Sequence, residues 1–346
     1  MTKKEHFIKV IKGEQTGRTP VFPLLMSFAA ERYGVSYRTF ASNGHALAEA
    51  QLMMAERFPI DAITVCSDAF RVSADLGGLI VFPEDKPPYL TKPLITSRDD
   101  LSVFQQTVMT KPDSRMRDRV KAVEELTRAA GDKLMVLGWV DMPFAEACSL
   151  CGLQNFLCML YEDPELAHHI LAELTQIVIK FATAQIDAGA EMIGAGDAAA
   201  SLLSTELYRE FACPYEHQVV QSIHDNKAMV KLHICGNTAH LLDDMISTGC
   251  DLFNVDHLVD LTTAATVYTN AGKAFKGNVD PVALLLQPPG ECARLARTCL
   301  EKAGARLYML SAGCEIPAQA SDENFLAFCC AVETHAQVSL CCNSKM

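Results

Sequence analysis

The chain has 346 residues, of which 49% are hydrophobic and 21% charged, and its formal net charge is −12. The apolar content excludes an intrinsically disordered chain. The acidic balance disfavours a nucleic-acid binder and a protein of anionic membrane surfaces, so a small molecule or a protein is the expected partner. We find no signal-peptide core near the start and no run of about 18 uncharged apolar residues. We therefore expect a cytoplasmic protein whose 14 cysteines mostly stay reduced.

Short apolar runs alternate with helical patterns along the whole chain. Each run has the nearly continuous hydrophobic character of a strand that is buried on both faces of a parallel sheet. In chain order, the expected strands are Val21–Leu25, Ala62–Cys66, Leu134–Val140, Met192–Ala195, Met229–His233, Leu252–Val255, Ala274–Lys276 and Leu307–Ser311.

Capping residues mark several helix boundaries between these strands. Pro164 opens a long helix that is predicted to run to about Ala188, where Gly189 ends it. Ser204 and Ser321 are the predicted N-caps of two later helices, because a serine hydroxyl accepts hydrogen bonds from free amides of a first turn.

Eight strands, each followed by a helix, predict a (β/α)8 barrel. We expect one domain over residues 1–346, with an irregular, proline-rich insertion near residues 82–115. A doubly wound sheet would need a phosphate loop, and the match to that pattern is Gly194–Ala199. This segment puts the carboxylate of Asp197 where a pyrophosphate would lie, and helical pattern resumes only near Ser204, so we reject this alternative.

The positions just beyond the strands' carboxyl ends carry an unusual set of residues. In a barrel these side chains converge on one face, where active sites are built. Turn preferences explain any single acidic residue there, but two histidines, two cysteines and several carboxylates on one rim indicate a functional site. The residues are Asp68, Asp141, Asp197, His233, Cys235, Asp256, His257, Asn278, Asp280, Cys314 and Glu315.

His233 and Cys235 form the sharpest local motif. Residues two apart on an extended segment face the same side, so one ion could contact both. Cys314 follows the last strand and can face them across the barrel mouth. One imidazole and two thiolates suit Zn²⁺ and leave a fourth position open for catalysis. Alternatively, the histidine is a hydrogen-bonded core residue and the cysteines are small hydrophobic residues, and the motif by itself does not decide between these interpretations.

The other cysteines favour packing. Cys148 and Cys151 form a CxxC pair without a second pair, in an apolar helical stretch that is more typical of a core than of a metal site. Packing is also expected for the cysteines in later helical patterns, among them Cys158 and Cys213.

Five segments, in order along nearly the whole chain, resemble the uroporphyrinogen decarboxylase superfamily. They are GRTPVFPLL, DAITVCSDAF, DPELAHHILAELT, GNVDPVALL and GCEIP with a following EN. That superfamily has a (β/α)8 barrel, in agreement with the strand count. Within it, KLHICGNTAHLL is similar to the methylcobamide:thiol methyltransferases, such as the methylcobamide:coenzyme M enzymes. Those enzymes hold a catalytic zinc through an HxC pair and a later GC motif, which implies zinc ligation by His233, Cys235 and Cys314.

The chain departs from the true decarboxylases in the segment after the first strand. Those enzymes have an MRQAGR segment whose arginines bind substrate carboxylates, whereas Met26–Glu31 has neither arginine. Glu31 would repel a porphyrinogen, and Arg32 substitutes only if the register slips by one. Asp68 still matches the essential aspartate of the decarboxylases.

The resemblance implies a methyl transfer between a corrinoid (methylcobamide), bound on its own carrier protein, and a small thiol that zinc deprotonates. Asp256 is expected to fill the fourth zinc position until the thiol arrives, with His257 behind it. The alternative role of Asp256 is to orient His233 or to cap the next helix. Coenzyme M, homocysteine or a folate is compatible as the acceptor, and the direction of transfer is open.

Two other functions remain open at this point. One is the metal-free decarboxylation of a porphyrinogen, and the other is non-catalytic binding of a corrinoid or a thiol beside a structural zinc. Zinc content distinguishes the metal-free decarboxylase from the other two functions. A fourth zinc ligand that exchanges with thiol distinguishes the methyltransferase from the non-catalytic binding protein.

Overall fold

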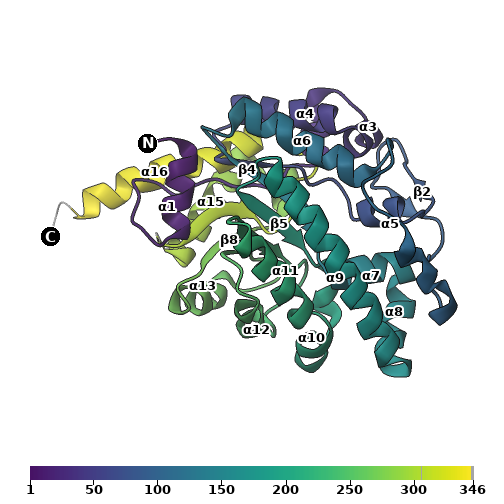
Figure 1. Ribbon diagram of the computed structural model, residues 1–346. Coiled ribbons are helices and arrows are strands. Elements are labelled where there is room, and N and C mark those ends of the chain that lie inside the picture. Colours follow the sequence, from purple (N-terminus) through teal and green to yellow (C-terminus); the bar gives the residue numbers. More distant parts are fainter. Residues whose placement is uncertain (305, 344–346) are drawn as a thin grey trace.

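A computed structural model describes residues 1–304 and 306–343, with side chains as far as Glu333. Seven parallel strands form one sheet surrounded by helices (Figure 1). Nearly every strand residue is buried, as expected for a parallel sheet that helices cover. In spatial order the strands are β1 (Ala62–Thr64), β4 (Met135–Asp141), β5 (Met192–Gly196), β6 (Met229–His233), β7 (Leu252–Asn254), β8 (Ala274–Val279) and β9 (Tyr308–Ala312).

The first predicted strand, Val21–Leu25, lies between the edge strands β9 and β1. The amide of Phe22 donates to the carbonyl of Leu310 at 2.9 Å, and the amide of Asp61 donates to the carbonyl of Val21 at 2.9 Å. The segment makes isolated bridges rather than a regular ladder, because Pro23 within it and Pro20 directly before it cannot donate. It completes the circle of the sheet, so the predicted barrel fold is confirmed, with seven regular strands and one irregular segment.

Helices connect the strands on the outside of the sheet. No helix in the described part of the chain has the length and apolar character needed to cross a bilayer. The helices are α1 (Lys3–Ile11), α2 (Ser27–Tyr33), α3 (Tyr37–Ser42), α4 (Gly44–Arg57), α5 (Arg71–Asp75), α6 (Arg115–Ala130), α7 (Pro143–Cys151), α8 (Leu153–Glu162), α9 (Pro164–Asp187), α10 (Thr205–Phe211), α11 (Cys213–Asp225), α12 (Leu242–Ser247), α13 (Leu261–Asn270), α14 (Pro281–Leu286), α15 (Pro289–Ala303) and α16 (Asp322–Asn343).

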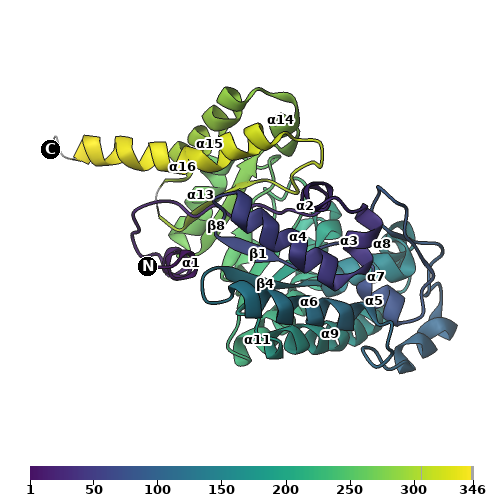
Figure 2. The same ribbon diagram turned by 90° about the horizontal axis from the view of Figure 1, so that it is seen from above.

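The predicted helix caps are confirmed. Helix α9 begins at Pro164 and ends one residue before Ala188. The Ser204 side chain accepts from the amide of Leu207 at the start of α10, and the Ser321 hydroxyl accepts from the amide of Asn324 at 3.1 Å. Helix α16 packs against α15 and then continues outward, away from the barrel (Figure 2).

The segment between β1 and α6 contains some regular structure. It holds a short antiparallel pair, β2 (Ile80–Val81) and β3 (Tyr89–Leu90), followed by the 3-10 helix η1 (Arg98–Gln105). The hairpin reaches the carboxyl ends of β4 and β5, where Tyr89 and Leu90 line a pocket together with Asp141. The insertion therefore covers part of the barrel mouth.

One layer of the barrel interior is built around the chain's single tryptophan, Trp139 of β4. A Cβ atom on Gly194 would lie 2.4 Å from its ring, so the missing side chain makes room for the indole. The strand register then aligns Asp141, Gly196 and His233 in one row across β4, β5 and β6. This row carries the polar side chains of the candidate site.

Candidate metal centre

His233, Cys235 and Cys314 meet at the carboxyl ends of β6 and β9. The Nε2 atom of His233 lies 3.1 Å from Sγ of Cys235 and 3.6 Å from Sγ of Cys314, and the two sulfurs are 3.9 Å apart. In a tetrahedral zinc site with bonds of about 2.3 Å to sulfur and about 2.1 Å to nitrogen, the ligands are separated by about 3.6–3.8 Å. The three atoms lie within 4.8 Å of one another, so this set fits one Zn²⁺ ion.

Burial and mutual contact set the protonation of the cluster. His233 is buried, and burial lowers its pKa, which favours the neutral imidazole that binds a metal. The hydrogen bond between the two thiols lowers the pKa of Cys314 and raises that of Cys235. Both cysteines are half-buried and the Nδ1 atom of His233 has no hydrogen-bond partner among the described residues. The cluster atoms are thus bonded mainly to one another.

The structure does not bring Asp256 into this cluster. Its Oδ2 accepts from the amide of Gly236 at 3.0 Å, and its Oδ1 accepts from the amide of Leu258 at 2.9 Å. The side chain of His257 lies 3.1 Å from the same carboxylate. Asp256 therefore fastens the loop that follows Cys235 and caps its own turn, which is close to the alternative role expected for it; it does not contact His233.

Two buried lysines lie in the barrel interior near the cluster. Lys231 lies two residues before His233 on β6, and its Nζ is 4.5 Å from the centre of the Trp139 ring. Lys276 of β8 donates to the carbonyl of Phe22 at 2.8 Å and to the hydroxyl of Ser311 at 3.0 Å. Burial lowers the pKa of Lys231 to about 8, so its ammonium group still carries charge at neutral pH.

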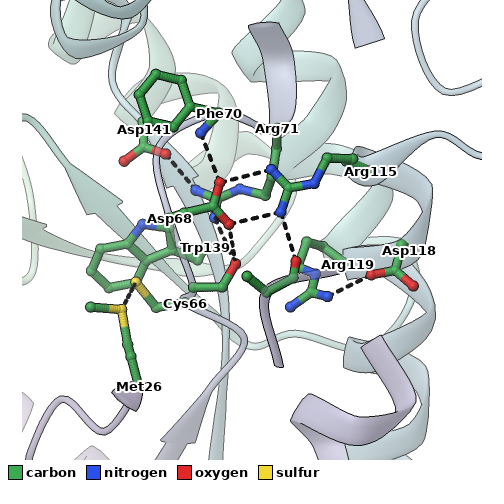
Figure 3. Close-up of polar contacts among 12 residues, drawn as sticks. Met26, Cys66, Asp68, Phe70, Arg71, Arg115, Asp118, Arg119, Trp139 and Asp141 are labelled. Carbon is green, nitrogen blue, oxygen red and sulfur yellow. Dashed lines mark hydrogen bonds and ion pairs between the residues drawn. The ribbon is translucent and has the colours of Figure 1, made fainter. Parts of the chain in front are cut away.

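Asp68 belongs to a different part of the rim, which Figure 3 shows. Arg115 of α6 binds its carboxylate with two hydrogen bonds of 2.7 and 2.8 Å, and Ser67 and the amide of Phe70 donate to it as well. Burial opposes the charged form of Asp68, but the arginines outweigh it and hold the pKa of this carboxyl below its usual range. Each oxygen of Asp68 is thus engaged in ion pairs.

Asp141 continues this ion-pair network toward the centre of the rim. Its carboxylate pairs with the buried guanidinium of Arg71, and burial raises its pKa to about 6. Asp141 also lines a largely apolar pocket of about 410 Å³ beneath the β2–β3 hairpin. One strand, β5, lies between it and His233, so the two main chains are about 10 Å apart.

Asp197 was expected in the pocket, but the structure buries it completely behind the rim. It faces Glu216 of α11, whose carboxylate in turn accepts a hydrogen bond from Tyr208. Burial raises the pKa of both carboxyl groups; Glu216 raises the pKa of Asp197 further, whereas hydrogen bonds from Asp197 and Tyr208 oppose the shift of Glu216. Asp197 follows β5, so its main chain reaches the rim while its side chain turns toward the outer helices.

The remaining candidates surround the cluster without joining it. Asn278 donates to the carbonyls of Asp256 and Val259, and Asp280 caps α14. Together with His257 they line a second pocket, of about 540 Å³, between α13, α14 and α15. Glu315 accepts from the amide and the hydroxyl of Ser27, at 2.5 and 2.6 Å, and burial raises its pKa.

The structure adds Lys231, Lys276, Arg71 and Arg115 to the site, none of which was selected from the sequence. A signal was present for the two lysines, because each interrupts an apolar segment that was predicted to be a buried strand. No such signal marked the arginines, since Arg115 is 47 positions from the carboxylate that it binds.

Packing of the other cysteines is mostly as predicted. Cys148 and Cys151 are buried in α7, whereas Cys158 of α8 is exposed, so its prediction was wrong. Cys213 is half-buried.

Comparisons with known proteins identify the family. The model of the uroporphyrinogen decarboxylase (URO-D) family matches residues 2–335. The chain belongs to this family. It is 27% identical to a uroporphyrinogen decarboxylase of Nitrosomonas europaea, over 97% of this chain and 98% of that protein. A uroporphyrinogen decarboxylase of Coxiella burnetii is also 27% identical, over 83% of this chain and 82% of that protein.

Solved structures of the same fold include enzymes of methyl transfer. A methyltransferase from Methanosarcina mazei superposes with a TM-score of 0.85 at 21% identity, over 97% of this chain and 99% of that one. A B12-independent methionine synthase from a Shewanella species superposes with a TM-score of 0.59 at 13% identity, over 88% of this chain and 89% of that one. At these identities the likeness concerns the fold.

Proposed function

We propose that this protein is a zinc-dependent methyltransferase that moves a methyl group between a corrinoid, carried on a partner protein, and a thiol acceptor. The observation that carries the proposal is the triangle of His233, Cys235 and Cys314, whose spacing fits a tetrahedral zinc site with one open position. The URO-D fold and a structural neighbour that is a methyltransferase support it.

The chain's own residues perform three tasks in this proposal. His233 and the two cysteines would hold the ion at the barrel mouth, and the half-buried sulfurs leave a side open to solvent. Bound zinc would lower the pKa of a thiol, which is about 8.5 when free, and so supply a nucleophilic thiolate at neutral pH. Asp256 would keep the loop after Cys235 in place through Gly236.

Ligation by Asp256 in the absence of thiol stays a prediction. It would require Oδ2 of Asp256 to leave the amide of Gly236, at 3.0 Å, and turn toward the ion. X-ray absorption of the zinc-loaded protein tests this directly. Asp256→Ala should then keep its zinc but change the resting coordination, and identical spectra of the variant and the unmodified protein would limit Asp256 to holding the loop.

Decarboxylation of a porphyrinogen is the second candidate, because the curated relatives carry that name. Arg32, which could have replaced a missing arginine, instead binds Asp322 at 2.9 Å and the carbonyls of Ala318 and Ala320. Asp68 is neutralised by Arg115. We therefore expect no coproporphyrinogen from uroporphyrinogen above a heat-killed control, and product above that control would favour the decarboxylase.

The experiment that tests the proposed function has two steps. Metal analysis of the purified protein should give about one zinc per chain. The zinc-loaded protein is then incubated with methylcobalamin and a panel of thiols that includes coenzyme M and homocysteine, and loss of the methyl-cobalt absorbance is followed. Zinc without any transfer would favour a non-catalytic binding protein, and absence of zinc would reject the proposal.

A further inference from the structure

Lys231 and Lys276 are unusual among the charged residues of this protein. Each is only 1% exposed, and among the described residues neither forms an ion pair with a carboxylate: their partners are the Trp139 ring, the Phe22 ring and carbonyl, and Ser311. A buried ammonium group without a counter-charge is costly, and proteins usually pair such a group or lose it. Burial lowers the pKa of Lys276 well below its usual range and two hydrogen bonds satisfy its amino group, so Lys231 is the group for which a nearby anion is expected.

The metal centre and these ammonium groups share the inner face of the sheet. Lys231 and His233 point to the same face of β6, since they are two residues apart on a strand. His233 is in register with Asn254, and Asn254 is in register with Lys276. Burial lowers the pKa of Lys231, and the thiols of Cys66, Cys314 and Cys235 oppose this shift. Lys231 therefore lies one inward-facing position below His233, and Lys276 lies in the same row as His233, two strands away.

The charge of the cluster changes when a substrate thiol binds. Two protein thiolates neutralise one Zn²⁺ ion, so the resting set of His233, Cys235 and Cys314 carries no net charge. A third thiolate in the open position gives the set one negative charge, in an environment where charges are poorly screened.

We infer that Lys231 is a positioning residue that stabilises an anionic thiolate in the fourth position of the metal centre. This inference rests on the proposed function and deepens it. Lys276 is anchored by two hydrogen bonds, whereas in the described part of the chain Lys231 has the face of Trp139 as its one partner, so its charge remains available to the cluster. The glycine at position 194 supports this arrangement, because its missing side chain lets the indole lie beneath the ammonium group.

The test compares two ligands on a protein loaded with Co²⁺, whose visible spectrum reports bound thiolates. 2-Mercaptoethanol binds as an anion and has no other charged group, and imidazole binds as a neutral molecule. Lys231→Met should lower the affinity for 2-mercaptoethanol at least about tenfold and leave the affinity for imidazole unchanged. Lys231→Arg, which keeps the charge, should restore thiol affinity.

The matched control is Lys273→Met. Lys273, just before β8, is also a lysine without a described ion pair, but it donates to the carbonyls of Gly249 and Cys250, just before β7, at the opposite end of the barrel. It should change neither affinity. Should Lys231→Met not fold, Lys231→Gln retains a polar head group and takes its place.

Three results would overturn the inference. Equal weakening of both ligands by Lys231→Met would mean that the lysine only supports the structure of the site. Unchanged thiol affinity in Lys231→Met would reject the charge role while leaving the proposed function intact. An unmodified protein that binds neither Zn²⁺ nor Co²⁺ would reject the proposed function, and the inference with it.

Discussion

The two halves of the barrel rim use charged and polar residues in opposite ways. Near β1 and β4, Asp68 and Asp141 are bound by Arg71 and Arg115, so the acids and bases of that side neutralise one another. Near β6 and β9, the cluster sulfurs and the imidazole of His233 have mainly one another as partners. The difference teaches that acidic residues on a rim do not by themselves make a site. Unsatisfied ligand atoms are the better indicator, because an ion or substrate can still satisfy them.

The largest loss of stability should follow from breaking the ion pairs near β1 and β4. Arg71→Met leaves the carboxylate of Asp141 buried without its partner, which should cost about 3–5 kcal/mol of unfolding free energy in urea at pH 7.5. The cost should fall as the pH is lowered, because burial already raises the pKa of Asp141 to about 6, loss of Arg71 raises it further, and protonation removes the unpaired charge. Arg38→Met, which breaks an exposed pair with Glu84, should cost at most about 1 kcal/mol. Similar losses of unfolding free energy in both variants would contradict the expectation that the buried ion pair matters more than the exposed one.

Near β6 and β9, substitutions in the cluster should change metal affinity rather than stability. Cys235→Ser should lower zinc affinity by more than about 100-fold, since even residues behind a metal ligand change affinity by about 10- to 100-fold. The control is Cys213→Ser, at a half-buried thiol that contacts Ser247 far from the cluster. Competition with a chromogenic chelator measures the affinity. Retention of full zinc affinity by Cys235→Ser would remove that residue from the ligand set.

A smaller effect on stability should come from the interior layer around Trp139, between these two parts of the rim. Gly194→Ala places a Cβ atom 2.4 Å from the Trp139 ring, so the indole must move, at a cost of about 1–3 kcal/mol. The emission of Trp139, the single tryptophan, should shift as well. Gly290→Ala, which has no atom within 4 Å of the new Cβ, serves as the control and should leave the emission unchanged. An unshifted spectrum in Gly194→Ala would mean that the layer is loosely packed.

The smallest effect concerns the buried acid pair behind the rim. Burial raises the pKa of Asp197 and Glu216, so the folded state holds protons that the unfolded state releases above pH 4. Their stabilising contribution is present below that pH and is lost as pH rises, by at most about 1.4 kcal/mol per pH unit for one proton. Asp197→Asn should remove this slope, so its stability relative to the unmodified protein should increase from pH 5 to pH 7. Parallel urea-unfolding profiles of the two proteins would show that no proton is held there.

Local pattern determined much of this protein from its sequence alone. Buried strands and serine-capped helices depend on neighbouring residues, so their periodicity and end signals were sufficient to predict the barrel. The spacing of His233 and Cys235 also fixed their common face, because side chains alternate along a strand. The family resemblance then supplied the expectation of zinc.

Tertiary structure decided what the sequence could not. Closure of the sheet brings Cys314 within 3.6 Å of His233 across 81 positions, and it makes the segment with Pro20 and Pro23 an irregular eighth member of the barrel. It also directs the side chain of Asp197 outward and uses the oxygens of Asp256 for the amides of Gly236 and Leu258. Whether a polar atom is free to bind an ion depends on which partners long-range packing places within about 3 Å of it, and spacing along the chain does not encode those partners.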